Sequence, residues 1–349
     1  MVKTEWKKHL DDLDKVYPKI SKNAYYILRG DQFSFGIMPT KGKENRVNTK
    51  LARRIFVNCC DAIIDELRAN NMKRAYLDTA VKTLNLNCND EISGKLMSDI
   101  LTDEIWEAFG GMNKHSPNKL VSYVIEQYAD KAYPEREKIY FSAEYSQIMS
   151  AVENNEFVRF RGSSKQERTF LPIGIMSDEW STYNYIVGLS VPEGKISVNR
   201  LSRVSGIKIV KNEKILGNID DMRKKAEETI ARKGIMFVSS EIPGEGIKVQ
   251  MTDRGVYMFN TMVFMRPIPI MMEKISQNNF SWEYTFDCTE LQARNYFFKF
   301  GKDVRVVSPK KLRDTFKKDI LTALKEYDVS EDDIDVLRQR HFDTKENHS

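Results

Sequence analysis

The chain has 349 residues, enough for two or three domains that each bury a core. Hydrophobic residues make up 41% of it and charged residues 30%, which is the composition of a globular protein rather than of a disordered or fibrous chain. The formal net charge of +5 is too small to indicate nucleic-acid binding by itself, so the positions of the basic residues carry more information than their number.

The sequence predicts a cytoplasmic protein without a membrane anchor. No run approaches the roughly 18 apolar residues that cross a bilayer. The charged start, Met1 to Lys8, is not followed by an apolar run, so no secretory signal is expected. The four cysteines show no disulfide or metal-binding pattern, which indicates a reducing compartment and neither a metal nor a cofactor. These cysteines are Cys59, Cys60, Cys88 and Cys288.

Residues 1–85 are predicted to form a first domain from a strand and two helices. Phe33, Phe35 and Ile37 alternate with smaller residues, as in a half-buried strand over 31–38. An apolar stripe over 51–67 predicts a helix, and a second helix is expected over 72–84. This order resembles the ribbon-helix-helix family of nucleic-acid binders, which implies an obligate dimer. The alternative is an unrelated strand and helix pair, because the outward strand positions carry no basic residue.

Two groups of basic residues would form polyanion-binding surfaces if the members of each share a face. The alternative for each group is an ordinary solvated surface. The group in the first domain is Lys41, Lys43, Arg46, Lys50, Arg53 and Arg54. The group in the middle of the chain is Arg159, Arg161, Lys165, Arg168, Arg200 and Arg203.

Residues 86–135 are predicted to be a helical connector. One helix is expected from Ser93 to Phe109, ended by Gly110 and Gly111. Ser116-Pro117 then opens the next helix, since proline is favoured in the first turn.

Residues 136–212 are predicted to form a small antiparallel sheet or barrel behind a leading helix, Ser142 to Val152. Short runs rich in Val, Ile, Phe and Tyr are separated by polar turns, a pattern typical of such sheets. The predicted strands are 157–161, 168–172, 180–189 and 200–204.

The order of these strands resembles the WYL-domain family. Arg168 and Pro172 match its R-x-x-x-P strand, and Arg200 and Arg203 match its R-L-x-R-I strand. The resemblance implies an Sm/SH3-like barrel.

Two positions depart from the family pattern. Asn184-Tyr185-Ile186 stands where the family has Trp-Tyr-Leu, although Trp180 lies just upstream. Gly162 replaces the usual Tyr at the end of the first strand.

The resemblance also implies a basic pocket in which Tyr185 and Arg203, together with Arg200 and Arg168, hold a phosphate or a base. Guanidinium groups clamp phosphates and a tyrosine ring can stack on an unpaired base. Arg159 and Arg161 are further candidates from the same segment. The alternative is that Tyr185 belongs to the core and that the arginines pair with Glu167 or Glu179. On a regular strand, Arg200 and Arg203 point to opposite faces unless a bulge intervenes.

The chain then continues with a polar linker helix over 213–234 and a third domain over 235–327. Strands are predicted at 247–251, 280–286 and 304–307, and helices at 253–265 and 289–300. The segment from Phe297 to Leu312 resembles the C-terminal extension found beside WYL domains, which implies a ferredoxin-like module that mediates pairing. Residues 328–349 read as a charged tail.

The sequence therefore predicts an α+β multidomain protein and no enzyme. None of its histidines stands in a metalloprotease or hydrolase motif, and no phosphate-binding glycine loop occurs. The combination of modules is similar to the accessory WYL proteins of type VI-D CRISPR systems. That resemblance implies binding of single-stranded RNA and modulation of an RNA-guided, RNA-targeting effector nuclease. The alternative is a dimeric DNA-binding regulator whose WYL domain senses a nucleotide-like ligand.

Overall fold

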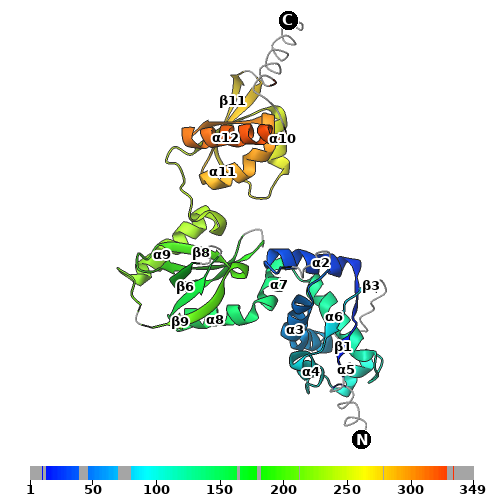
Figure 1. Cartoon of the computed structure of the whole chain (residues 1–349). Helices are drawn as coiled ribbons and strands as arrows, with labels where there is room; N and C mark the ends of the chain where they lie inside the picture. Colours follow the sequence, from blue (N-terminus) through cyan, green and yellow to red (C-terminus); the bar gives the residue numbers. More distant parts are fainter. Residues whose placement is uncertain are drawn as a thin grey trace. The chain divides into compact units, whose positions relative to one another are not determined.

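The computed structural model describes residues 10, 13–38, 46–69, 80–162, 166–178, 182–211, 213–277, 279–327 and 333. The chain divides into two compact units, Met1–Glu228 and Thr229–Ser349 (Figure 1). Each unit has its own cluster of buried apolar side chains. In these described ranges no helix is both long and apolar enough to pass through a membrane.

The first unit begins with helices and very short strands. They are β1 (Lys15–Val16), β2 (Lys19–Ser21), α2 (Lys22–Ser34), α3 (Thr49–Ala69), β3 (Ala80–Thr83), β4 (Leu86–Asn87), α4 (Asp90–Leu96), α5 (Asp103–Ala108), α6 (Ser116–Asp130), α7 (Tyr133–Tyr140) and α8 (Ser142–Glu153). β1 pairs with β4 and β2 pairs with β3, all antiparallel. The β1–β4 pair therefore joins segments on either side of the boundary predicted at residue 85.

The long helix α3 confirms the apolar stripe predicted over 51–67. Its buried side chains recur every three or four residues, so one face of the helix is apolar. That face packs against α4, α6 and α7. Residues far apart in the sequence thus share one core, which continues into the sheet that follows.

The strand predicted at 31–38 is wrong. α2 continues to Ser34, and Gly36 follows its C-terminal cap with a φ of 70°. Asp31 and Gln32 are both buried whereas Phe33 is exposed, which is not the alternation of a strand. The helix predicted at 72–84 lies mostly outside the described residues, and 80–83 form β3 instead. The strand-helix-helix order of a ribbon-helix-helix unit is therefore not found in the described part of the chain.

The connector differs from its prediction in one respect. The single helix predicted from Ser93 to Phe109 is two short helices, α4 and α5. The stop at Gly110 and Gly111 is confirmed, and both glycines adopt the positive φ that favours this residue. The helix predicted to open at Ser116-Pro117 is confirmed as α6.

Residues 157–210 form a five-stranded antiparallel sheet in the order β8-β7-β6-β5-β9. Its elements are β5 (Phe157–Arg161), β6 (Glu167–Ser177), β7 (Asn184–Ser190), β8 (Ile196–Arg200), the 3-10 helix η1 (Leu201–Arg203) and β9 (Ser205–Val210). The leading helix α8 packs on β6 and β9 (Figure 1). The strand predicted over 200–204 is wrong, because β8 ends at Arg200 and η1 turns the chain.

The second unit is built on a four-stranded antiparallel sheet in the order β11-β12-β10-β13. Helix α9 (Ile219–Lys233) leads into it across the boundary between the units. The elements that follow are η2 (Ile235–Phe237), β10 (Ile247–Met251), α10 (Asp253–Thr261), β11 (Pro269–Gln277), β12 (Phe280–Phe286), α11 (Glu290–Phe297), η3 (Phe298–Asp303), β13 (Val304–Ser308) and α12 (Lys310–Glu326). The predicted strands β10, β12 and β13 are confirmed, whereas β11 and α12 were not predicted. The tail predicted over 328–349 lies outside the described residues except for Asp333.

Candidate nucleic-acid interface

Two of the five arginines proposed for the central site are paired with carboxylates. Arg159 Nη2 lies 3.0 Å from Glu213 Oε1, and Arg161 Nε lies 3.6 Å from Glu167 Oε1. Both arginines are exposed strand residues of β5. The pairing of Arg161 with Glu167 is the alternative that the sequence left open. These two guanidinium groups are already partly neutralised.

The other three arginines are not neutralised in this way. Among the described residues, no carboxylate lies within ion-pair distance of Arg168, Arg200 or Arg203. A guanidinium group without an acidic partner is available to bind a phosphate with two parallel hydrogen bonds. These three arginines are therefore better candidates than Arg159 and Arg161.

Arg200 stacks on an aromatic ring at the point where β8 meets η1. Its Cζ atom lies 3.2 Å from the ring centroid of Tyr183, and β-sheet pairing places Arg200 opposite Tyr185. The Nε atom of Arg200 is buried and has no hydrogen-bond partner among the described residues. Stacking holds a planar guanidinium in place without using its hydrogen-bond donors. We call Arg200, Arg203, Tyr183 and Tyr185 the Arg200 cluster.

Arg203 ends η1 with an exposed side chain that lies against the end of α2. A Cβ built on Gly36 would stand 3.3 Å from Arg203 Nη1. Gly36 directly follows the C-terminal cap of α2, where backbone carbonyls carry the negative end of the helix dipole. The absence of a side chain at Gly36 thus lets the Arg203 guanidinium approach that helix end.

Tyr185 is a core residue in this structure, with 7% of its surface exposed. Burial raises its pKa to about 12, and the nearby Asp178 carboxylate adds to the increase. Its ring is not accessible enough to stack on a base. Tyr183 is the half-buried aromatic residue of the cluster, and the sequence did not single it out. The sequence could have indicated Tyr183 by its position, because it lies two residues before Tyr185 and directly before Asn184, the first residue of β7.

A buried carboxylate fixes the backbone of the Arg200 cluster. Glu137 of α7 is fully buried and accepts hydrogen bonds from Asn184 N (2.7 Å), Asn184 Nδ2 (2.9 Å) and Ser202 N (3.1 Å). Asn184 opens β7 and Ser202 is the middle residue of η1. Sequence reasoning missed Glu137, because its partners lie 47 and 65 residues further along the chain.

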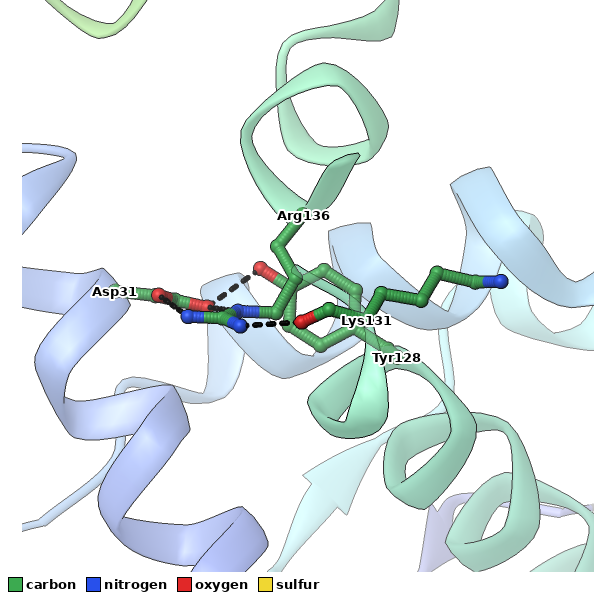
Figure 2. Close-up of polar contacts among 4 residues, drawn as sticks. All are labelled: Asp31, Tyr128, Lys131 and Arg136. Carbon is green, nitrogen blue, oxygen red and sulfur yellow. Dashed lines mark hydrogen bonds and ion pairs between the residues drawn. The ribbon is translucent and has the colours of Figure 1, made fainter. Parts of the chain in front are cut away.

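Arg136, the residue before Glu137, binds a different part of the first unit. Its Nε and Nη2 atoms donate to the two carboxylate oxygens of Asp31 at 2.8 and 3.0 Å (Figure 2). Tyr128 Oη donates to Asp31 Oδ2 at 2.8 Å, and Arg136 Nη1 donates to the Lys131 carbonyl at 2.5 Å. Burial raises the pKa of Tyr128, and the Asp31 carboxylate raises it further. Burial alone would lower the pKa of Arg136, but Asp31 reverses that effect.

Arg168 does not join the Arg200 cluster. It pairs with Phe160 at the start of β6, whereas Tyr185 pairs with Met176 near the other end of that strand. The eight residue steps from Arg168 to Met176 along β6 correspond to roughly 25 Å at about 3.3 Å per residue. Arg168 instead lines a separate cavity of about 500 Å³, together with residues of β5, β6, β7 and β8. The cavity lining is Phe160, Glu167, Arg168, Thr169, Phe170, Ser190, Val191, Ser197 and Glu213.

The basic group predicted in the first domain is only partly described. Lys41 and Lys43 lie outside the described residues, Arg46 and Lys50 are exposed, and Arg53 is half-buried. Arg54 forms an ion pair with Glu144 (2.8 Å), and its Cζ lies 4.6 Å from the ring centroid of Tyr140. Arg54 therefore holds α3 to α7 and α8, and it is not free to bind a ligand.

The four thiol groups are wholly or partly buried. In the described part of the chain, no three side chains among His, Cys, Asp and Glu gather as a metal site would require. Burial raises the pKa of Cys59, and it raises those of Cys60 and Cys288 to about 12. The pKa of the half-buried Cys88 is also raised by burial. These thiols are poor nucleophiles at neutral pH, since the thiolate is the reactive form.

The fold resembles that of a solved protein over most of the chain. A protein described as a CRISPR Cas-related protein is 20% identical, with a TM-score of 0.68 over 90% of this chain and 94% of that one. Proteasome accessory factor B/C (PafBC) of Arthrobacter aurescens is 13% identical over 94% of this chain and 54% of that one, and its TM-score of 0.25 carries no argument. No protein-family model matches the sequence, and no curated protein matches it. The likeness to the CRISPR Cas-related protein therefore shows a shared fold.

Proposed function

We propose that this protein is a CRISPR-associated regulatory protein that binds single-stranded RNA through the Arg200 cluster. The observation that carries the proposal is that Arg200 caps and Arg203 ends one turn, η1, and that neither has an acidic partner among the described residues. Such an arrangement suits an unpaired nucleotide. The guanidinium groups can bind its phosphate, and an aromatic ring can stack on its base. The role is one of binding rather than catalysis.

The proposal also assigns each of the two sheets to a domain class and the protein to a type of CRISPR system. The five-stranded sheet would be a WYL domain of the Sm/SH3-like class, because the segment from Arg200 to Arg203, which matches the family's R-L-x-R-I strand, connects its last two strands. The order β10-α10-β11-β12-α11-β13 of the second unit fits a ferredoxin-like module. The likeness to a CRISPR Cas-related protein supports an accessory role beside an effector nuclease in the cytoplasm, and type VI-D systems are the candidates.

We also propose a homodimer, formed by the second unit. The edge expected at 31–38 no longer supports pairing, because that segment is not a strand. The support comes from β11, an edge strand whose apolar side chains Ile270, Met271 and Met272 are 62%, 47% and 59% exposed. An exposed apolar edge strand is a site where a second chain can add to the sheet.

The RNA proposal is tested by removing one positive charge at a time. Arg200→Gln and Arg203→Gln are each expected to weaken binding of a fluorescein-labelled single-stranded oligoribonucleotide by about 1–3 kcal/mol, measured by fluorescence anisotropy. Each should also reduce the salt dependence of binding, because fewer counterions are released. The matched control is Arg161→Gln, since Arg161 already pairs with Glu167. Parental affinity in both variants, with intact thermal melting, would contradict the proposal.

One observation favours a second function, that of a DNA-binding regulator whose central sheet senses a small ligand. The cavity beside Arg168 has a volume of about 500 Å³, which is within the range of small-molecule sites. Preference for duplex over single-stranded nucleic acid in the same binding assay, with no effect of Arg203→Gln, would support this second function.

A further inference from the structure

We infer that α7 is a positioning element for the RNA site, in which Glu137 sets the geometry of Arg200 and Arg203, and Arg136 couples that geometry to α2. The inference rests on the proposed RNA-binding function and adds residues that do not contact RNA.

Two consecutive side chains of α7 bind different parts of the first unit. Successive residues of a helix point about 100° apart, so neighbours can reach different partners. Arg136 binds the Asp31 carboxylate with two hydrogen bonds, and Figure 2 shows Arg136 and Tyr128 meeting at Asp31. Glu137 binds Asn184 and the Ser202 backbone on the other side. One turn of helix therefore connects α2 with β7 and η1.

The contacts form a closed ring. Asp31 and Gly36 lie five residues apart at the C-terminal end of α2. Asp31 binds Arg136, the next residue Glu137 binds Ser202, and the residue after Ser202 is Arg203, whose guanidinium lies against Gly36. A displacement of α7 relative to α2 would therefore change the position of η1 relative to the end of α2.

A series of aromatic contacts connects the same two helices to the Arg200 cluster. Phe35 lies 5.9 Å from Tyr133 between ring centroids, Tyr133 lies 5.4 Å from Tyr183, and Tyr183 carries the stacked Arg200. Tyr133 is the first residue of α7 and Phe35 is the cap of α2. The same two helices are thus linked indirectly to both arginines of the cluster, to Arg203 through Ser202 and Gly36 and to Arg200 through Tyr133 and Tyr183.

Glu137 is suited to position a turn because its carboxylate is held by N–H donors. It is fully buried and, within the described ranges, has no cation at ion-pair distance. Carboxylates bound by N–H groups form short, directional hydrogen bonds. If the acceptor is removed, the Asn184 and Ser202 N–H groups lose their partner in a buried place. Relaxation of η1 to recover those hydrogen bonds would move Arg203.

The test is a double-mutant cycle on RNA binding by the full-length chain. Glu137→Gln keeps the size of the side chain but turns one acceptor into an NH₂ group that faces an N–H donor. We expect Glu137→Gln to weaken binding of the labelled oligoribonucleotide about tenfold, within the range of a hydrogen bond to a charged group. Arg203→Gln should weaken binding much less in the Glu137→Gln background than in the parent, because the cation is already displaced.

Additivity distinguishes positioning from a loss of folded protein. If Glu137→Gln only lowers the fraction of folded chains, Arg203→Gln weakens RNA binding by the same factor in both backgrounds. The inference then fails. The active fraction is measured by stoichiometric titration and thermal melting. Should Glu137→Gln not fold, Asn184→Ala provides the same cycle, because it removes the side-chain amide that donates to both Glu137 and the Pro134 carbonyl of α7. Asp61→Asn is the control, since it breaks the distant Lys95–Asp61 ion pair of the same unit and should leave RNA affinity unchanged.

The outcome also separates this inference from the proposed function. If Arg200→Gln and Arg203→Gln both leave RNA affinity at the parental value, the RNA site itself is refuted. If those variants weaken binding and Glu137→Gln and Asn184→Ala do not, the RNA site stands and the positioning role of α7 is refuted.

Discussion

At the scale of single residues, the neighbours of an arginine decide what it can do. Arg54 and Arg136 look no different in the sequence from Arg200 and Arg203, yet the first two are held by Glu144 and Asp31. Arg200 instead lies on a tyrosine ring. The arginines of the central segment could be singled out from the sequence. Their partners come from beyond β9, from a neighbouring strand or from the residue before β7, so which of these arginines are free depends on tertiary contacts.

The buried ion pair of Asp31 and Arg136 gives a prediction about stability. The two side chains are 2% and 13% exposed, and Asp31 also accepts from Tyr128. Asp31→Asn should lower the free energy of unfolding by about 3–5 kcal/mol, because it leaves a buried guanidinium without its counter-charge. Urea unfolding followed by circular dichroism measures this change.

The control for that prediction is a less buried ion pair. Asp319→Asn breaks the ion pair with Arg294, whose side chain is 46% exposed. This substitution should change the free energy of unfolding by about 1 kcal/mol or less. Equal losses in the two variants would show that the Asp31 network does not stabilise the first unit more than a surface pair does.

At the scale of secondary-structure elements, the local sequence pattern was sufficient to predict a helix or strand where the segment buries its own apolar face. β5, β10, β12 and α3 follow the period of their apolar residues. The pattern failed where distant polar groups decide the conformation. The segment 31–38 alternates like a strand, but hydrogen bonds to Asp31 from Tyr128 and Arg136 fix it as a helix end.

Two further elements show the same limit. Residues 200–204 read as a strand, but Glu137 draws the Ser202 backbone into a turn. β11 was missed because Pro267 and Pro269 precede and open it, and prolines usually indicate a loop. Topology within the sheet of the second unit could therefore not be derived without knowing that β11 exists.

The edge strand β11 gives a prediction about association. Ile270→Lys and Met272→Lys should each shift the protein from dimer to monomer, because a charge on an exposed edge opposes pairing with another chain. Both side chains are already exposed, so the melting temperature of the monomer should not fall. Light scattering coupled to gel filtration measures the mass. Ile320→Lys on α12 is the control at a site with 45% exposure, and a dimer that persists in both β11 variants would place the interface elsewhere.

At the scale of the whole molecule, each unit contains a buried tyrosine that predicts alkaline destabilisation. Burial raises the pKa of Tyr185 in the first unit and of Tyr296 in the second from 10.0 to about 12. The folded state therefore favours the neutral phenol. This contribution to stability is complete below pH 10 and is lost as the pH rises from 10 to about 12, because the unfolded chain releases its protons first.

Urea midpoints measured across that pH range should therefore decrease steadily. Tyr296→Phe removes one of these buried phenols, so the variant should show a weaker dependence on pH than the parent. The Tyr296 hydroxyl also donates to the Phe259 and Met262 carbonyls, so the variant is expected to be less stable at neutral pH. Parallel pH profiles for parent and variant would rule out Tyr296 as a source of the alkaline loss.

The uneven burial of the four cysteines has a practical consequence for optical experiments. Cys59, Cys60 and Cys288 are buried, and Cys88 alone of the four is half-buried. A maleimide dye added at mildly alkaline pH should therefore attach at Cys88 without any cysteine being replaced. A dimer labelled in this way would carry two identical fluorophores, and energy transfer between them would depolarise the emission. Recovery of polarisation on dilution would then report the dissociation of the two chains in real time.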